Sequence, residues 1–158
     1  MERKLNLGCG FDKRKGYLNI DLNSFHNPDL VADIRKLDML PSDYFEEILA
    51  QDVLEHLERR DILPTLVEWA RLLSIGGRLI LRIPNLMGLF LLFLERETPK
   101  DHDELIHCLF GTQAYNGDYH LAGFTDILIK DYLNKSNFKI ISMKPKDIWL
   151  LDIIAQKI

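Results

Sequence analysis

Two glycines and an acidic residue near the start of the chain have the types and spacing of a ligand-binding site. Gly8 and Gly10 follow a short apolar segment, and Asp21 ends a second apolar segment eleven positions after Gly10. Glycine lets the backbone approach a ligand where a Cβ atom would obstruct it, and a carboxylate accepts hydrogen bonds from ribose hydroxyls. The pattern therefore predicts a pocket for a nucleoside-type cofactor.

A dinucleotide site is the obvious alternative, and the sequence disfavours it. Such a site has a third glycine in Gly-x-Gly-x-x-Gly, an acid about 20 residues further on and a helix that opens directly from the turn. Lys13 occupies the position of the third glycine, and Asp21 comes too early. Residues 11–16 also leave no room for a proper helix.

The hydrophobic pattern predicts the α/β fold class. Apolar runs bounded by polar or glycine turns predict parallel strands near residues 4–8, 17–21, 29–33, 46–52 and 77–83. Apolar residues at helical spacing from Ile62 predict a helix before the fifth strand, and Gly76-Gly77 is expected to end it.

The last part of the chain predicts a helix and a hairpin. The helix is expected at 125–136, and two strands are expected near 138–144 and 148–156. Because only Pro145-Lys146-Asp147 joins these strands, we expect them to pair antiparallel.

Residues 85–124 interrupt the alternation of strands and helices. We expect two helices, at 86–96 and 101–110, and then a loop rich in Gly, Asn, Tyr and His from 111 to 124. Open α/β sheets place substrate-specific parts in insertions of this kind, after the carboxyl end of a strand. We therefore expect a substrate lid within a single domain of residues 1–158.

Composition limits the class of protein and its partners. The chain has 158 residues and a net charge of -4, which gives no sign of nonspecific binding to nucleic acid or to a membrane surface. Two cysteines, Cys9 and Cys108, make no disulfide framework and indicate a cytoplasmic setting. The most apolar run, 86–94, is far shorter than the roughly 20 residues that cross a bilayer.

Five motifs in a fixed order resemble the class I S-adenosylmethionine-dependent methyltransferases, and most of all the small "type 11" members. The motifs are the Gly8-Cys9-Gly10 turn, Asp21, the strand end Ala32-Asp33-Ile34, the segment 47–57 with its Leu-Glu-His-Leu element, and the segment 73–79. The resemblance implies a doubly wound, mostly parallel seven-stranded sheet with a C-terminal antiparallel hairpin. It also implies S-adenosylmethionine as cofactor and S-adenosylhomocysteine as product.

The resemblance implies a cofactor-binding role for particular residues. They are Gly8, Cys9, Gly10, Asp21, Leu22, Asp33, Ile34, Asp52, Val53 and His56. Asp21 would accept the ribose hydroxyls, and Asp33 would take the adenine amino group, with Ile34 against the ring. Asp52 and Val53 would lie beside the sulfonium group.

The chain departs from the family pattern in two places. Most members begin with a helical segment that caps the pocket, whereas only residues 1–4 precede the first strand here. The first crossover helix is expected to be missing or very short, because 11–16 cannot hold it. The insertion at 85–124 would then supply the lid, and part of one sheet face would be uncovered. A homodimer could form through that face or through the apolar helix 86–94.

Methyl transfer from a sulfonium is an in-line displacement that depends mainly on alignment, so no dedicated catalytic residue is obligatory. A general base would assist a hydroxyl or ammonium acceptor, and His56 and His120 are the candidates because histidine titrates near neutral pH. Each has a purely structural alternative. His56 could satisfy backbone groups at a helix start, and His120 could hold its loop in place.

We expect methyl transfer to a small-molecule acceptor. An RNA or protein acceptor is one alternative, and a non-catalytic S-adenosylmethionine-binding module or regulatory subunit is another. We expect no metal site, because His102 and His107 are five positions apart and so face different sides of a helix that also carries Cys108.

Overall fold

The computed structural model describes residues 2–115 and 117–158 of the chain. Its strands are β1 (Lys4–Leu7), β2 (Leu18–Asp21), β3 (Leu30–Val31), β4 (Phe45–Gln51), β5 (Leu73–Pro84), β6 (Phe138–Lys146) and β7 (Leu150–Lys157). Its α-helices are α1 (Ile62–Leu72), α2 (Leu86–Glu95), α3 (Pro99–Phe110) and α4 (Asp126–Lys135). Short 3₁₀ turns lie at Ser24–His26, Leu54–His56 and Arg59–Asp61.

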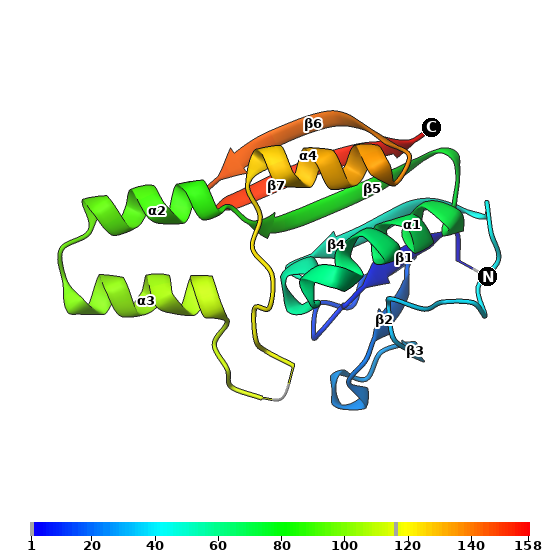
Figure 1. Cartoon of the computed structure of the whole chain (residues 1–158). Coiled ribbons are helices and arrows are strands. Elements are labelled where there is room, and N and C mark those ends of the chain that lie inside the picture. The colour runs from blue at the N-terminus through cyan, green and yellow to red at the C-terminus, as the bar shows by residue number, and fades with distance from the viewer. Residues whose placement is uncertain (1, 116) are drawn as a thin grey trace.

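The strands form one seven-stranded sheet in the order β3-β2-β1-β4-β5-β7-β6 (Figure 1). The first five strands are parallel, and β7 runs antiparallel to both β5 and β6. This confirms the predicted Rossmann-like methyltransferase fold, with its mostly parallel sheet and C-terminal antiparallel hairpin.

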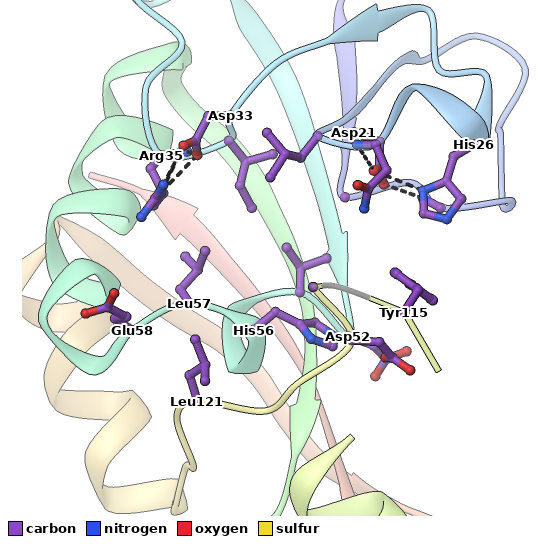
Figure 2. A pocket seen from close by; sticks show the side chains of 18 residues that line it. Asp21, His26, Asp33, Arg35, Asp52, His56, Leu57, Glu58, Tyr115 and Leu121 are labelled. Atoms are coloured by element: carbon purple, nitrogen blue, oxygen red, sulfur yellow. Dashed lines mark hydrogen bonds and ion pairs between the residues drawn. The ribbon is translucent and has the colours of Figure 1, made fainter. Parts of the chain in front are cut away.

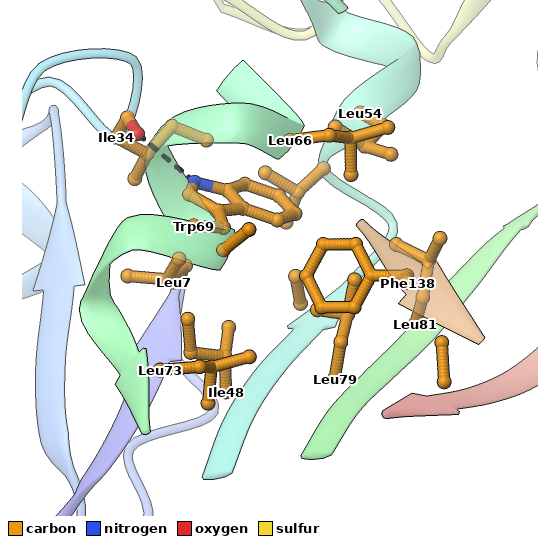
Figure 3. Close-up of a cluster of buried hydrophobic side chains, with 14 of the residues drawn as sticks. Leu7, Ile34, Ile48, Leu54, Leu66, Trp69, Leu73, Leu79, Leu81 and Phe138 are labelled. Atoms are coloured by element: carbon orange, nitrogen blue, oxygen red, sulfur yellow. Dashed lines mark hydrogen bonds between the residues drawn. The ribbon is translucent and has the colours of Figure 1, made fainter. Parts of the chain in front are cut away.

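Helices α1 and α4 cover the same face of the sheet (Figure 1). The two helices pack on each other and on the strands. Trp69 is completely buried between these layers together with Phe138, and Ile129 is part of the same core (Figure 3). This single hydrophobic core holds the central strands in place, and so it fixes where their carboxyl ends lie.

The other face of the sheet carries polar side chains. Tyr17 donates a hydrogen bond to Glu47, and Arg78 from the neighbouring strand contacts the same carboxylate at 2.6 Å. Asn6 donates to the side chain of Asn19 at 3.0 Å. Residues 8–17, which lead from β1 to β2, form turns without a helix, so the missing first crossover helix is confirmed. Asn6, Asn19 and Glu47 are buried, and both asparagines also hydrogen-bond to the backbone of this segment, which lies where that helix would otherwise pack.

The end of α1 differs from the prediction. Gly76-Gly77 was expected to stop the helix, but α1 ends at Leu72 and β5 begins at once with Leu73. Leu73 pairs with Phe45, and the register then shifts before the next pairs form. The glycines occupy this irregularity: Gly76 has a φ of +79°, and a Cβ on Gly77 would lie 2.8 Å from a backbone oxygen.

The hairpin turn also lies later than predicted. Pro145 and Lys146 continue β6 and pair with β7, so the turn comprises 147–149. Proline is compatible with this strand because β6 is at the edge of the sheet, where a missing ladder donor faces outward.

The insertion contains the two expected helices, and they form an antiparallel pair that extends from the end of the sheet (Figure 1). Leu89, Leu92 and Leu105 bury the contact between α2 and α3. The outer side of α2 exposes Met87, Phe90, Leu91 and Leu94. A homodimer through this helix stays a prediction. None of the helices in the described ranges is long and apolar enough to span a bilayer.

Candidate active site

A cavity of about 500 Å³ opens at the carboxyl ends of the parallel strands (Figure 2). Its volume is in the range of small-molecule sites, roughly 300–1,000 Å³. Every predicted cofactor-binding residue except Cys9 lines it, namely Gly8, Gly10, Asp21, Leu22, Asp33, Ile34, Asp52, Val53 and His56. The loop of the insertion adds Tyr115, Gly117, Asp118 and Leu121 to the wall.

The two glycines have different physical reasons to be glycine. Both adopt left-handed backbone, with φ of +61° at Gly8 and +49° at Gly10. A Cβ on Gly8 would lie 2.6 Å from the side chain of Val53, whereas a Cβ on Gly10 would meet no atom within 4 Å. Gly8 is therefore required by packing, and Gly10 leaves space open on the cavity side.

Alanine at each glycine is expected to separate these two roles. Gly8→Ala should lower the free energy of unfolding by more than the ~1–2 kcal/mol of a left-handed alanine, because Val53 must also move. Gly10→Ala should lower the free energy of unfolding only by the ~1–2 kcal/mol of a left-handed alanine. Its main effect should be weaker ligand binding. Urea unfolding and ligand calorimetry measure both effects. Equal destabilisation by the two substitutions would contradict this assignment.

Asp21 is held in place by three hydrogen bonds. Its Oδ2 accepts from the Gly10 N–H at 2.8 Å, and its Oδ1 accepts from the Asn23 N–H at 2.8 Å and from His26 Nδ1 at 3.0 Å. An ionised carboxylate offers about four acceptor positions, so one remains for a ligand hydroxyl. The contact with Gly10 also ties the end of β2 to the glycine turn.

An aromatic cluster that the sequence analysis missed borders this part of the cavity. His26 lies edge-on to Phe11 and to Tyr115, with ring centroids 4.7 Å and 5.9 Å away, and Phe25 packs beside it. His26 is buried, whereas Phe11 is 79% exposed. The position of His26 five residues after Asp21 was the available clue, but only the 3₁₀ turn brings its ring back to the carboxylate.

Asp33 is engaged by an arginine that the sequence analysis also missed. Arg35 donates to both oxygens of Asp33 through Nε and Nη2, and its other terminal nitrogen reaches Asp61 at 2.8 Å (Figure 2). These bonds hold the pKa of the Asp33 carboxyl below its usual range. Between them, the carbonyl of Ile34 accepts a 3.0 Å hydrogen bond from buried Trp69, which anchors this wall to the core.

Cys9 lies behind the cavity wall and has no reactive character. Its side chain is buried, and burial together with the nearby Asp21 raises the pKa of the thiol to about 11. A thiol at that pKa is protonated at neutral pH, so a small buried residue is what the position holds.

A second cavity of about 220 Å³ adjoins the first, and the two share Asp52 and Asp118. Asp52 follows β4 with a left-handed φ of 56°, and Arg82 lies 3.7 Å from its carboxylate. Partial burial raises the pKa of Asp52, and Arg82 opposes that shift. The second cavity has further lining from the end of β5, from α3, from the loop and from the hairpin turn, namely Pro84, His107, Cys108, Gly111, Thr112 and Trp149.

His56 and His120, the two predicted catalytic residues, lie together at the boundary between the cavities. Their ring centroids are 4.9 Å apart in an edge-on arrangement, with His56 lining the larger cavity and His120 the smaller. The loop is fastened here, because Leu121 N–H donates to the Glu55 carbonyl at 2.7 Å. Burial lowers the pKa of His120, and the neighbouring His56 adds to that effect.

Glu55 is the third side chain at this boundary, and the sequence analysis did not single it out. It is 1% exposed, and burial raises the pKa of its carboxyl to about 8. Its position in the Leu-Glu-His-Leu element was visible in the sequence, but its burial beneath the loop was not.

Comparison with known proteins agrees with this architecture. Residues 5–81 match a family described as "Methyltransferase domain". Residues 5–81 of this chain therefore belong to that methyltransferase-domain family. No curated protein is similar enough in sequence to match it.

Solved structures share the fold at low sequence identity. An S-adenosylmethionine-dependent methyltransferase from Methanosarcina mazei has a TM-score of 0.74 and 20% identity, over 98% of this chain and 92% of that one. A possible exported protein from Bordetella parapertussis has a TM-score of 0.72 and 11% identity, and the match covers 99% of this chain but only 62% of that one.

A third solved structure contains ligands. The 1,6-didemethyltoxoflavin-N1-methyltransferase from Burkholderia thailandensis, bound to its substrate and S-adenosylhomocysteine, has a TM-score of 0.64 and 14% identity, over 98% of this chain and 70% of that one. At these identities the likeness establishes the methyltransferase fold, and the acceptor of this chain must be argued from its own residues.

Proposed function

We propose that this methyltransferase transfers a methyl group from S-adenosylmethionine to a small-molecule acceptor. The observation that carries the proposal is the pair of adjoining cavities, which meet at Asp52 and Asp118. The larger cavity has the volume and lining for the cofactor, and the smaller is suited to an acceptor. A shared boundary is what an in-line displacement requires, because nucleophile, methyl group and leaving sulfur must align.

The chain's own residues fit the cofactor. The open space beside Gly10 leaves room for the methionine and ribose parts, and the remaining acceptor position of Asp21 suits a ribose hydroxyl. Asp33 and Ile34 line the same cavity and are the proposed contacts of the adenine, and Val53 is a proposed contact near the sulfonium group. When bound, S-adenosylmethionine supplies an electrophilic methyl group on a sulfonium.

The residues at the boundary orient the acceptor and receive its proton. The acceptor's lone pair forms the new bond to the methyl carbon, the bond to sulfur breaks and leaves a neutral thioether, and the acceptor's proton passes to a base. His56 and His120 lie at this boundary, and an imidazole is the side chain suited to accept that proton.

The loop of the insertion encloses the site. Tyr115 and Leu121 reach the larger cavity, while His120 and Thr112 reach the smaller one. One segment therefore lines both cavities. This supports the proposed role of 85–124 as a substrate lid.

The smaller cavity favours a small acceptor over a macromolecule. Its volume of about 220 Å³ and its lining by Trp149, Pro84 and Cys108 suit a compact, partly apolar molecule with one polar group. The net charge of -4 also argues against an RNA acceptor.

Calorimetry followed by a turnover assay tests the proposal. We expect S-adenosylmethionine and S-adenosylhomocysteine each to bind at one equivalent, and a panel of small hydroxyl and amine metabolites to yield S-adenosylhomocysteine. No binding of either cofactor form would contradict the proposal. Binding without turnover across small molecules, RNA and protein acceptors would instead indicate a non-catalytic binding module.

Asp21→Asn is expected to weaken S-adenosylmethionine binding by about 10–100-fold, since a hydrogen bond to a charged group contributes ~1.5–3 kcal/mol. Calorimetry measures the change, and thermal unfolding shows whether the fold persists. Asp38→Asn is the matched control, because Asp38 is exposed, forms an ion pair with Lys36 and does not line the larger cavity. Unchanged affinity in Asp21→Asn would remove Asp21 from the ribose site.

A further inference from the structure

Three potential metal ligands converge at the boundary between the two cavities. Glu55 and His56 follow β4, and His120 comes from the loop of the insertion. One ligand atom from each of the three residues lies within 4.8 Å of the other two. Two imidazoles and a carboxylate in one place form a nitrogen and oxygen donor set that divalent transition metals prefer.

Glu55 has an unfilled hydrogen-bonding position at this point. Its Oε2 is buried and has no hydrogen-bond partner among the described residues. A buried polar atom without a hydrogen-bond partner destabilises the folded state by about 1–3 kcal/mol, so such atoms are rare in folded proteins. A bound ion is one explanation for such an atom. A metal ion within the cluster would satisfy it.

The backbone already orients the His56 imidazole for coordination. His56 Nδ1 lies 3.1 Å from the carbonyl oxygen of Tyr119, and because a carbonyl only accepts, that nitrogen carries the proton. The lone pair of the neutral ring is then on Nε2. Metal-binding histidines usually have one ring nitrogen held in this way.

We propose that Glu55, His56 and His120 bind one divalent transition-metal ion at the boundary between the two cavities. Metal bonds of about 2.0–2.2 Å require the donors to approach one another somewhat, which small side-chain rotations achieve. Three protein ligands leave coordination positions open toward the second cavity. An acceptor oxygen in that position would lose its proton more readily, so the ion would replace the imidazoles as the activating group.

The site was not expected from the sequence, which predicted no metal. The ligands considered there, His102, His107 and Cys108, are not the ones that the structure brings together. His120 reaches the other two only because the loop folds back onto the segment after β4.

Metal titration of the chelator-treated full chain tests the site without any assay of activity. We expect Zn²⁺ and Co²⁺ each to bind at one equivalent by calorimetry, and Co²⁺ to give visible absorption bands of a nitrogen and oxygen site. Glu55→Gln and His120→Ala should each weaken binding at least 10-fold. His102→Ala is the control and should bind normally, because its imidazole lies outside both cavities.

Circular dichroism of each variant confirms that it is folded before the titration. No binding of either metal by the folded wild-type chain would overturn the proposal, and so would undiminished binding by both Glu55→Gln and His120→Ala. Binding of S-adenosylmethionine is measured separately. A chain that binds the cofactor but no metal would overturn this inference and leave the proposed function intact.

Discussion

Raising the pH from 6.5 to 8 is expected to lower the free energy of unfolding of the metal-free protein by about 1.5 kcal/mol through Glu55 alone. The carboxyl has a pKa of about 8 in the folded chain, against a model value of 4.5. The folded state therefore holds a proton that the unfolded state releases. This contribution of Glu55 to the free energy of unfolding is fully present below pH 4.5. It decreases by an amount on the order of 4 kcal/mol as the pH rises toward 8.

The measurement is urea unfolding at a series of pH values, in the presence of a chelator, for the wild type and Glu55→Gln. Glutamine keeps the shape of the side chain and cannot ionise, so the variant should lack this pH dependence and should be more stable than the wild type at pH 8. The histidines are present in both proteins, so their contribution cancels in the difference between the two free energies of unfolding. This includes His120, whose lowered pKa makes stability rise with pH. Parallel curves would show that Glu55 is not a buried titrating group.

Trp69→Ala is expected to destabilise the protein by about 3–5 kcal/mol, the usual cost of removing a large buried aromatic side chain. Trp69 is completely buried between α1 and the sheet, and it is the largest side chain in the core (Figure 3). Its indole N–H also holds the Ile34 carbonyl at 3.0 Å, so the substitution removes packing and a hydrogen bond together.

Trp69→Phe separates these two contributions. Phenylalanine keeps much of the packing but loses the hydrogen bond, which typically contributes about 1 kcal/mol. Trp69→Phe should therefore lower the free energy of unfolding much less than Trp69→Ala. Because Ile34 lines the larger cavity, the phenylalanine variant should also bind S-adenosylmethionine more weakly while it remains folded. Urea unfolding and calorimetry measure the two effects. An alanine variant within 1 kcal/mol of the wild type would contradict the role of Trp69 in the core.

Elements that depend on local pattern were predictable from the sequence. The strands follow apolar runs, and the cofactor cavity follows from the glycine turn and the acids at successive strand ends. The polar face was visible too, since Lys4-Leu5-Asn6-Leu7 alternates between polar and apolar residues, which is typical of a strand with one solvated side. The sequence analysis treated these strands only as apolar runs.

Features that depend on partners distant in the sequence were not predictable. Gly76-Gly77 resembled a helix stop, but the glycines serve an irregular pairing with β4 that only the sheet defines. The association of Glu55 with His120 requires the path of the whole insertion, and so does the burial that raises the Glu55 pKa. His26 and Arg35 were missed because short turns, rather than helices or strands, direct them toward the acids.

The direction of β7 determines which segment of the chain can vary when the acceptor molecule differs. Because β7 is antiparallel, its first residue, Leu150, lies beside Pro84, the last residue of β5. The turn before it therefore reaches the edge of the sheet where the parallel strands end, and Trp149 from that turn lines the second cavity. Changes in the length or composition of this C-terminal turn can alter selectivity while the cofactor residues, all nearer the N-terminus, stay the same. Asp52 and Asp118 line both cavities, so this turn is the part of the proposed acceptor site that can vary without any change in the proposed cofactor site.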